Sequence, residues 1–439
     1  MDNSTLLRLE TYNPWLRDPS LWPSALSARL PAEVVARSVR LTLDPARATL
    51  VVGPRQAGKS TLILLRLQRE ARPPLLLPLD DPLLRDLCLS GAHFAERVRT
   101  LGPGFSAFVF DEVQHLEEAG LFLKTLVDLR LGIPIVATGS SAFHLNARTR
   151  ESLAGRAHRV RLLPLSLAEV SAHAMRAEPA YRAESTERAC LDRMLVWGGY
   201  PEVWLTEPER ERQALLLDLV QAHLLRDASD AHRIQRPEAF RRILRLAATQ
   251  VGNLVNQAEL ASIAGVAAST VTEYLAILEE SHVLARVPPF LGGMRAEITS
   301  TPKLFLLDNG LRNQLHGGFS PFEGRGDRGA LLENLVFTEL TKAAAPTDEI
   351  GFWRTRNGAE VDFVVRADDH LVAVEVKAGA LGRPTLPRSC RSFIEAYAPQ
   401  ALLVINHGIE EEHHLDLTAI RFCRPERVAR ELARAIHRE

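Results

Sequence analysis

The segment from Gly53 to Thr61 constrains the fold of this chain more than any other stretch. It reads Gly-Pro-Arg-Gln-Ala-Gly-Lys-Ser-Thr, which completes the phosphate-binding-loop pattern G-x-x-x-x-G-K-[ST] between an apolar run at 48–52 and a helix-forming run at 61–67. Glycines in such a loop let the backbone wrap around a phosphate chain, and the N–H groups of the loop and of the helix N-terminus face its negative charge. The sequence therefore predicts a nucleoside triphosphate site; a chance match of a short pattern is the alternative.

Two side chains of this loop have predicted roles in the chemistry of ATP. Lys59 is expected to reach the β- and γ-phosphates, and Ser60 to bind Mg²⁺. The expected nucleotide-binding residues are Gly53, Pro54, Arg55, Gln56, Ala57, Gly58, Lys59, Ser60 and Thr61.

A second motif, Phe108-Val109-Phe110-Asp111-Glu112, is an apolar strand that ends in two carboxylates. This is the Walker B pattern, in which Asp111 holds Mg²⁺ and Glu112 polarises the water that attacks the γ-phosphate. Ligands of open α/β sheets bind at the carboxyl ends of the strands, where both acids fall. The pair favours hydrolysis over binding alone; a buried strand followed by a solvated acidic turn is the alternative.

A third apolar strand, 133–138, is followed by Gly139-Ser140-Ser141. A polar residue there can sense the γ-phosphate, and Ser140 and Ser141 are the candidates. Serine and glycine after a strand are also ordinary turn residues, so the two interpretations stay open.

Length and composition limit the remaining possibilities. A chain of 439 residues is expected to divide into two or three domains. Its 53 basic and 54 acidic residues give no overall basic charge, so any DNA surface has to be local, as the arginine-rich stretch 233–245 permits; a solvated helix face is the alternative there. Four scattered cysteines, no signal-peptide pattern and no apolar run of about 20 residues predict a cytoplasmic protein that contacts no membrane.

The order of patterns predicts an α/β fold. After an N-terminal arm (1–40) that contains four prolines, strands at 49–52, 75–79, 107–110, 133–138 and 159–163 alternate with helical segments, which is typical of a parallel sheet. We expect this ATPase domain to span 41–170 and a helical lid to span 171–250. Within the lid, the turn Trp197-Gly198-Gly199-Tyr200-Pro201 is either structural or lies against the base of the nucleotide.

Residues 251–300 have the pattern of a winged helix-turn-helix. Asn256 and Glu259 have capping-box spacing before a helix that ends near Ala264, and Ser269 is expected to cap a second helix. Residues 283–287 are a candidate wing strand. The outward residues of the second helix are short or acidic, which favours protein packing or recognition of DNA shape over base-specific contacts.

Residues 301–439 carry a second group of polar residues in two alternating strands. Alternation puts Glu375 and Lys377 on one face of the later strand, and Asp362 lies on the earlier one. The acids are candidate Mg²⁺ ligands, with Glu333 of a preceding helix as a further ligand, and Lys377 is a candidate catalytic lysine for phosphodiester cleavage. The spacing D-x12-E-x-K resembles the PD-(D/E)xK nuclease core; an ion pair on a polar sheet face is the alternative.

Taken together, the motifs resemble a prokaryotic family of AAA-type ATPases with a C-terminal domain of uncharacterised function. Besides the sites above, the resemblance rests on Leu153-Ala154-Gly155-Arg156, Gly198-Gly199-Tyr200-Pro201, Leu307-Asp308-Asn309-Gly310-Leu311 and Glu333-Asn334. It implies an AAA+ core, a winged helix and a restriction-endonuclease-like domain. It also implies a homo-oligomer or ring in which an arginine finger reaches the next subunit's nucleotide, and Arg156 is the candidate. A salt bridge within its own domain is the other use of Arg156.

The leading hypothesis is an ATPase that remodels or translocates duplex or branched DNA, with the C-terminal domain gripping or cutting it. The alternative is a nucleotide-gated regulator that binds a protein partner and has an inert nuclease-like domain. A small-molecule kinase fits the phosphate-binding loop but leaves the other motifs without a role.

Overall fold

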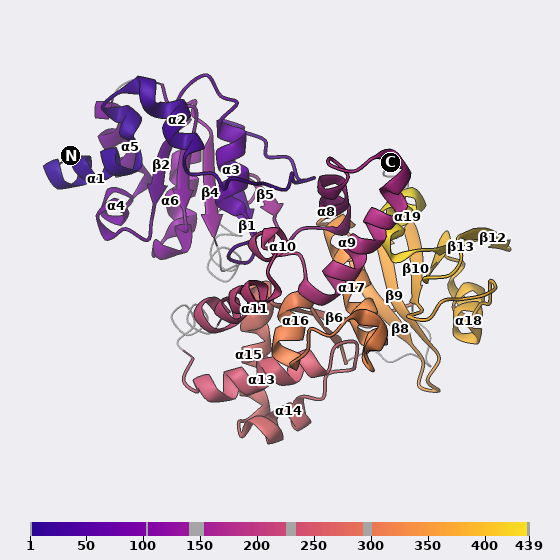
Figure 1. The fold of residues 1–439 in the computed structure, drawn as a ribbon. Helices are drawn as coiled ribbons and strands as arrows, with labels where there is room; N and C mark the ends of the chain where they lie inside the picture. Colours follow the sequence, from indigo (N-terminus) through magenta and orange to yellow (C-terminus); the bar gives the residue numbers. More distant parts are fainter. Residues whose placement is uncertain (1, 102–103, 140–152, 225–233, 293–300, 437–439) are drawn as a thin grey trace. The chain divides into compact units, whose positions relative to one another are not determined.

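The computed structural model describes residues 2–101, 104–139, 153–224, 234–292 and 301–436 (Figure 1). The chain divides into two compact units. Met1–Pro164 with Glu280–His282 form the first unit, and Leu165–Glu279 with Val283–Glu439 form the second. The finer division expected from the sequence, with boundaries near 40, 170, 250 and 300, stays a prediction.

The first unit is built on a five-stranded parallel sheet with the strand order β2-β3-β4-β1-β5. The strands are β1 (Ala48–Val52), β2 (Leu75–Pro78), β3 (Phe108–Asp111), β4 (Ile135–Gly139) and β5 (Ala157–Arg161). Their ends lie within two residues of the predicted ones, because each strand is a short apolar run between polar or proline-containing segments. The parallel sheet brings the carboxyl ends of β1, β3 and β4 to one edge.

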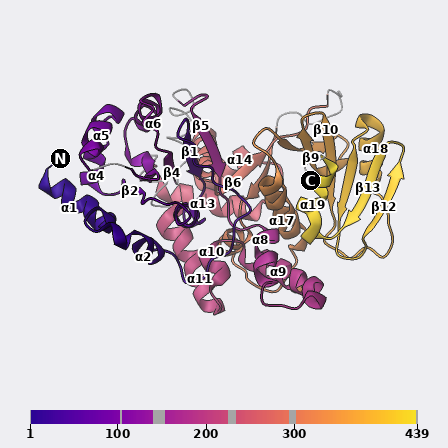
Figure 2. The same ribbon diagram turned by 90° about the horizontal axis from the view of Figure 1, so that it is seen from above.

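Both faces of this sheet are buried, as is usual for parallel sheets. The helices of the unit are α1 (Asn3–Tyr12), α2 (Trp22–Ser27), α3 (Lys59–Leu67), α4 (Pro82–Leu87), α5 (Gly91–Val98) and α6 (Ala119–Asp128). Leu50 and Phe110 pack in a core with residues of α5 and α6, whereas Val51 and Val109 pack in a second core with residues of α2 and α3. Figure 2 shows α5 and α6 on one side of the strands and α2 on the other.

The N-terminal arm is folded and protects the edge of the sheet. The Asn13 side chain donates to the carbonyl of Leu76 at 2.9 Å and accepts its N–H at 2.7 Å, so it pairs with edge strand β2 as a neighbouring strand would. Trp15 donates to the carbonyl of Pro74 at 2.8 Å. Unpaired edge strands invite pairing with other chains, and these contacts occupy part of that edge.

The second unit begins with helices and a two-stranded hairpin. The helical elements are α8 (Leu167–Ala174), α9 (Ala183–Trp197), α10 (Pro201–Leu205), α11 (Glu209–Asp218), η6 (Leu219–Leu224), α13 (Pro237–Thr249), α14 (Gln257–Ala264), α15 (Ala268–Glu280) and α16 (Asn309–His316). Strands β6 (Leu284–Val287) and β7 (Lys303–Leu306) pair in antiparallel fashion.

The pair α14 and α15 lies where the sequence predicts two helices joined by a turn. The Asn256 side chain caps α14 by accepting the N–H of Glu259 at 3.1 Å, and Gly265 ends the helix with φ of 69°. The predicted cap of the second helix is wrong: Ser269 lies inside α15, which begins at Ala268. The helix begins two residues before the start that a cap at Ser269 implies, and its buried face includes Val271 as predicted.

The C-terminal part is a six-stranded mixed sheet with the order β12-β13-β11-β10-β9-β8. The strands are β8 (Glu349–Arg354), β9 (Glu360–Ala367), β10 (His370–Val376), β11 (Ala401–Ile405), β12 (Glu411–Leu415) and β13 (Thr418–Cys423). Helix α18 (Arg388–Tyr397) covers one face, and α17 (Arg328–Ala343) and α19 (Val428–Ala435) cover the other (Figures 1 and 2). Strands β10, β11 and β13 are parallel to one another.

No single helix in the described ranges is long and apolar enough to cross a membrane. The pair Gln257–Ala264 and Ala268–Glu280 passes the test of length and composition jointly, but it is bent by 100°. The four cysteines are buried free thiols.

Candidate functional site

The loop between β1 and α3 has the backbone shape that its two glycines permit. A Cβ atom at Gly53 would lie 2.0 Å from the carbonyl oxygen of Leu162, and Gly58 has φ of 92° immediately before α3. The Arg37 side chain stabilises the loop, because it donates hydrogen bonds to the carbonyls of Ala57 at 2.8 Å and Leu163 at 2.6 Å. No pattern in the sequence pointed to Arg37, because its two acceptors are backbone atoms far apart in the chain.

Lys59, the first residue of α3, is buried and directed into the loop. Its Nζ atom donates to the carbonyls of Gly53 at 3.0 Å and Pro54 at 2.9 Å. The ammonium therefore lies within the concave side of the loop, where the charge of a bound phosphate would be stabilised. The remaining loop residues, Arg55, Gln56, Ala57 and Thr61, lie in the same β1–α3 connection or the first turn of α3.

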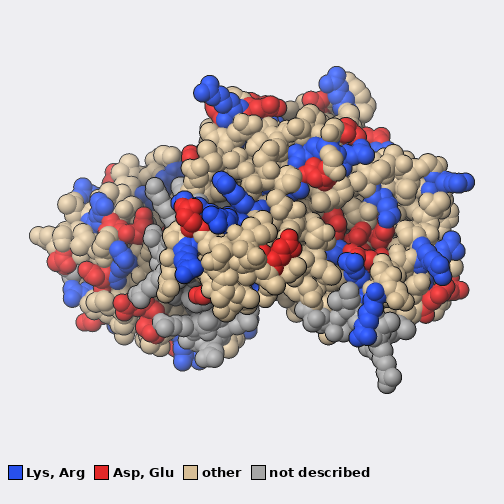
Figure 3. All heavy atoms as spheres, turned by 90° about the horizontal axis from the view of Figure 1, so that it is seen from below, with Lys and Arg blue, Asp and Glu red and all other residues tan. Residues whose placement is uncertain are grey.

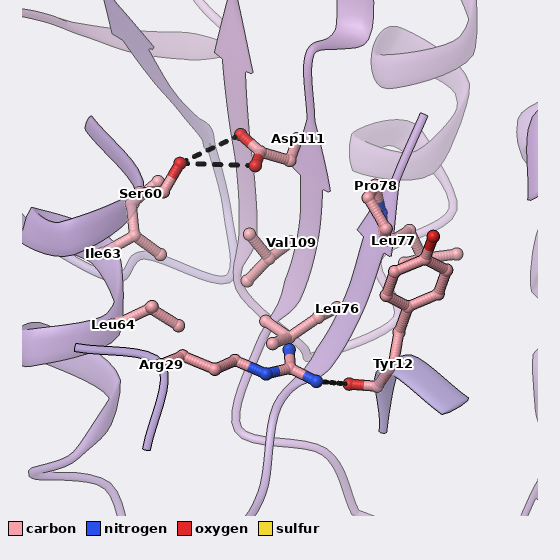
Figure 4. Close-up of a pocket in the computed structure, with 10 residues that line it drawn as sticks. All are labelled: Tyr12, Arg29, Ser60, Ile63, Leu64, Leu76, Leu77, Pro78, Val109 and Asp111. Carbon is pink, nitrogen blue, oxygen red and sulfur yellow. Dashed lines mark hydrogen bonds between the residues drawn. The ribbon is translucent and has the colours of Figure 1, made fainter. Parts of the chain in front are cut away.

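Ser60 and Asp111 lie together, as the sequence predicts for two groups that share Mg²⁺. The Ser60 hydroxyl is 3.3 and 3.4 Å from the two carboxylate oxygens of Asp111 (Figure 4). A hydroxyl and a carboxylate are oxygen ligands of the kind Mg²⁺ takes, so the pair fits the ion. Both residues also line a cavity of about 330 Å³, which has Tyr12 and Arg29 at its other end.

The Asp111 carboxylate is destabilised in its charged form. Burial raises its pKa, the hydrogen bond from Thr138 opposes this shift, and the neighbouring charge of Glu112 adds to it. A carboxylate with a raised pKa gains from a nearby cation, because the cation stabilises its ionised form. The environment therefore favours a cation beside Asp111.

Thr138, at the end of β4, organises the two acids. Its hydroxyl donates to Asp111 and accepts the backbone N–H of Glu112 at 2.9 Å. Glu112 has φ of 58°, a left-handed conformation that is unusual for a residue with a side chain, and Gln114 donates to its carboxylate. Strained backbone of this kind costs about 1–3 kcal/mol and concentrates at functional sites. The sequence prediction passed over Thr138 in favour of the serines that follow it.

Two predicted residues are not brought to this site by the described structure. Ser140, like Ser141, lies outside the described residues. Arg156 donates from Nε to Asp128 at 2.7 Å, and both side chains are more than one-third exposed. Arg156 thus makes the salt bridge within its own domain that the sequence left as an alternative, and its role as a finger stays a prediction.

The polar residues of the C-terminal sheet converge from three elements. Glu333 comes from α17 and Asp362 from β9, and Glu375 comes from the neighbouring strand β10. Asp362 accepts the backbone N–H of Val376 at 2.7 Å, and the Lys377 ammonium donates to Glu375 at 2.6 Å. Burial raises the pKa of Asp362 well above its usual range, and the charges of Glu333 and Glu375 raise it further.

A lysine that the sequence prediction did not include enters this group. Lys303 of β7 is buried, and its Nζ atom lies 3.2 Å from Glu333 and 2.5 Å from Glu360. Across the described ranges, no group of three or more His, Cys, Asp or Glu side chains is arranged to hold a metal ion. The roles of Glu333, Asp362 and Glu375 as metal ligands stay a prediction.

The turn at 197–201 packs inside the second unit. Asp308 accepts the N–H of Gly199 at 2.7 Å, and a Cβ atom at Gly198 would lie 2.2 Å from the Asp308 carboxylate. The Asn309 side chain donates to the carbonyl of Leu331 at 3.1 Å and accepts from Asn334 at 2.7 Å. These contacts give the glycine turn and the Asp308-Asn309-Gly310 segment a structural role.

The strand order, the phosphate-binding loop and the two acids at the end of β3 agree with a comparison of the sequence with models of protein families. A family model described as an AAA domain matches residues 45–171. This segment is therefore similar to P-loop domains of the AAA type. Two domains of unknown function, DUF8612 and DUF4143, match residues 188–321 and 328–422.

Relatives extend over most of the chain. An uncharacterized protein of Mycobacterium tuberculosis is 27% identical over 405 residues, which is 90% of this chain and 85% of the relative. An uncharacterized protein of Methanocaldococcus jannaschii is 23% identical over 344 residues, with 76% and 75% of the two chains covered.

Among solved structures, a STAND ATPase with a tetratricopeptide repeat sensor from Pyrococcus horikoshii has a TM-score of 0.26 and 12% identity, covering 72% of this chain and 48% of its own. AMPPCP-bound DnaA from Aquifex aeolicus has a TM-score of 0.24 and 12% identity, covering 64% and 89%.

Proposed function

We propose that this protein is a Mg²⁺-dependent ATPase that uses ATP hydrolysis to act on DNA. The observation that carries the ATPase half is the grouping of Lys59, Ser60, Asp111 and Glu112 at the carboxyl edge of one parallel sheet. In this proposal Lys59 binds the β- and γ-phosphates, and Ser60 with Asp111 holds Mg²⁺, which neutralises the charge on the phosphates. Glu112, oriented through Thr138 and Gln114, polarises the attacking water.

The DNA half rests on the region around α14 and α15. Helix α13 carries exposed Arg242 and Arg245, and Arg236 just before it donates to the carbonyl of Gly265 in the turn between α14 and α15 at 3.2 Å. A basic helix face beside a helix-turn-helix is suited to phosphate contacts. On the face drawn in Figure 3, basic and acidic side chains of the described residues are intermixed, so we expect a local DNA surface rather than a broad one.

The test is steady-state ATP hydrolysis by the full chain, alone and with single-stranded, duplex and four-way-junction DNA. Lys59→Ala provides the blank, because it removes the ammonium from the loop. We expect at least one DNA form to stimulate hydrolysis. A rate that is the same with every DNA and without DNA would contradict the DNA half and leave the ATPase half intact.

The second candidate is a nucleotide-gated regulator that binds a protein partner and has an inert C-terminal domain. The position of Lys303 among the C-terminal carboxylates favours it, because a lysine held there opposes a divalent cation. For the same reason we do not extend the proposal to cleavage by Lys377, Glu375 and Asp362. Mg²⁺-dependent DNA cleavage that Glu375→Ala abolishes would exclude the inert form.

A further inference from the structure

The polar group in the C-terminal sheet has more cations than a metal site needs. We define the acidic cluster as the carboxylates of Glu333, Glu360, Asp362 and Glu375 together with the cations Lys303, Lys377 and Arg354. Arg354 lies 3.2 Å from Glu360. Four carboxylates thus lie with three cations, and burial raises the pKa of Asp362 well above its usual range.

Lys303 is the most deeply buried of the three cations in the cluster. Its side chain is 2% exposed, whereas that of Lys377 is 37% exposed. Besides its contacts with Glu333 and Glu360, its Nζ atom lies 5.3 Å from the centre of the Phe352 ring, which also stabilises a cation. Burial by itself would lower the pKa of Lys303, but Glu333 and Glu360 raise it overall, so the lysine stays charged.

One carboxylate oxygen in the cluster is buried and accepts no hydrogen bond from a nitrogen or a hydroxyl. Glu375 is 5% exposed, and its Oε1 atom accepts from Lys377, whereas its Oε2 atom accepts from no nitrogen or hydroxyl; the buried Cys390 thiol also interacts with this carboxylate. The charges of Glu333 and Glu375 both raise the pKa of Asp362, so the three carboxylates lie near one another. An unsatisfied buried carboxylate oxygen is costly, and a cation beside it would satisfy it.

We propose that the ammonium of Lys303 takes the place of a divalent metal ion among Glu333, Glu360, Asp362 and Glu375. As long as β7 keeps its position, the cluster then holds no Mg²⁺. Lys303 belongs to the β6–β7 hairpin and not to the C-terminal sheet. Metal binding at the cluster is therefore coupled to the position of that hairpin. This inference is independent of whether the ATPase domain acts on DNA.

The experiment measures Mn²⁺ bound to the full chain without nucleotide, by isothermal titration and by the loss of the free-Mn²⁺ resonance. The proteins are wild type, Asp362→Asn, Lys303→Met and Lys303→Met with Asp362→Asn. Wild type and Asp362→Asn should bind equal amounts. Lys303→Met should bind one Mn²⁺ per chain more than wild type does, because one positive charge has left the cluster. The gain should vanish when Asp362→Asn is added.

Two results overturn the proposal. A wild-type chain that binds one Mn²⁺ more than Asp362→Asn has a metal site in spite of Lys303. A folded Lys303→Met with no additional Mn²⁺ shows that the lysine is not what excludes the metal. If Lys303→Met does not fold, the double variant Lys303→Met with Glu360→Gln replaces it, because it removes one cation and one carboxylate together. This double variant should also bind one additional Mn²⁺ per chain. The comparison of wild type with Asp362→Asn needs neither lysine variant.

Arg366→Met, which removes an ion pair with Glu349 on the same sheet, is the control and should bind as much Mn²⁺ as wild type does.

Discussion

Thr138 and Glu112 are joined across neighbouring strands by a hydrogen bond of 2.9 Å from the backbone N–H of Glu112 to the Thr138 hydroxyl, which in turn donates to Asp111. One buried hydroxyl thus fixes both the acid proposed to hold Mg²⁺ and the backbone of the acid proposed to polarise the attacking water. Its removal would leave the N–H of Glu112 without this acceptor.

We expect Thr138→Val to lower the turnover number for ATP by about tenfold to a hundredfold, because small displacements of catalytic groups have effects of that size. The Mg²⁺ concentration for half-maximal activity should rise, since Asp111 loses its orienting donor. Thr138→Ser keeps the hydroxyl and should retain most of the activity. Turnover of Thr138→Val at the wild-type rate would remove the proposed role of Thr138.

Asn13→Ala should destabilise the first unit by roughly 2 kcal/mol, because two hydrogen bonds to the Leu76 backbone are lost at about 1 kcal/mol each. Urea denaturation of the two proteins measures the difference. Ser24→Ala, which removes an exposed side-chain bond to the carbonyl of Leu21, is the control and should change little. Equal midpoints for Asn13→Ala and wild type would show that the arm does not protect the edge of β2.

Asp327→Asn should reveal a pH-dependent contribution to the stability of the second unit. Hydrogen bonds from Arg325 hold the pKa of Asp327 well below its usual value, and buried Arg312 adds to the shift. Because the folded pKa is below the unfolded value of about 3.9, the unfolded state binds more protons as the pH falls. The contribution is complete above about pH 5 and is lost as the pH falls below about 4.

The measurement for Asp327 is the difference in unfolding free energy between wild type and Asp327→Asn. We expect roughly 3 kcal/mol at pH 7, since two buried arginines lose their charged partner. The difference should shrink between about pH 5 and pH 3. A difference that stays constant over this range would mean that Asp327 acts by packing and not by charge.

Arg242→Ala with Arg245→Ala should weaken DNA binding by roughly tenfold and make its salt dependence shallower, because each phosphate contact contributes to that slope. Arg388→Ala with Arg391→Ala removes the same charge from exposed positions on α18 and is the matched control. Fluorescence anisotropy with the DNA form that stimulates hydrolysis measures both. Equal losses in the two double variants would indicate general electrostatics and not a surface on α13.

The sequence by itself determined the local parts of the ATP site. The phosphate-binding loop and the strand that ends in Asp111 and Glu112 are contiguous patterns, and their backbone conformation follows from glycine content and short apolar runs. The two-helix turn at Gly265 was predictable for the same reason, since caps act within a few residues.

Only the tertiary structure decided which side chains meet. Thr138 reaches Asp111 because β4 lies beside β3 in the sheet, and Lys303 reaches Glu333 and Glu360 because β7 lies against α17 and β9. Such contacts depend on strand order and packing, which join residues 27 to 57 positions apart, and local patterns do not encode them. The same packing places Lys303 beside carboxylates of the group that the sequence predicted as metal ligands.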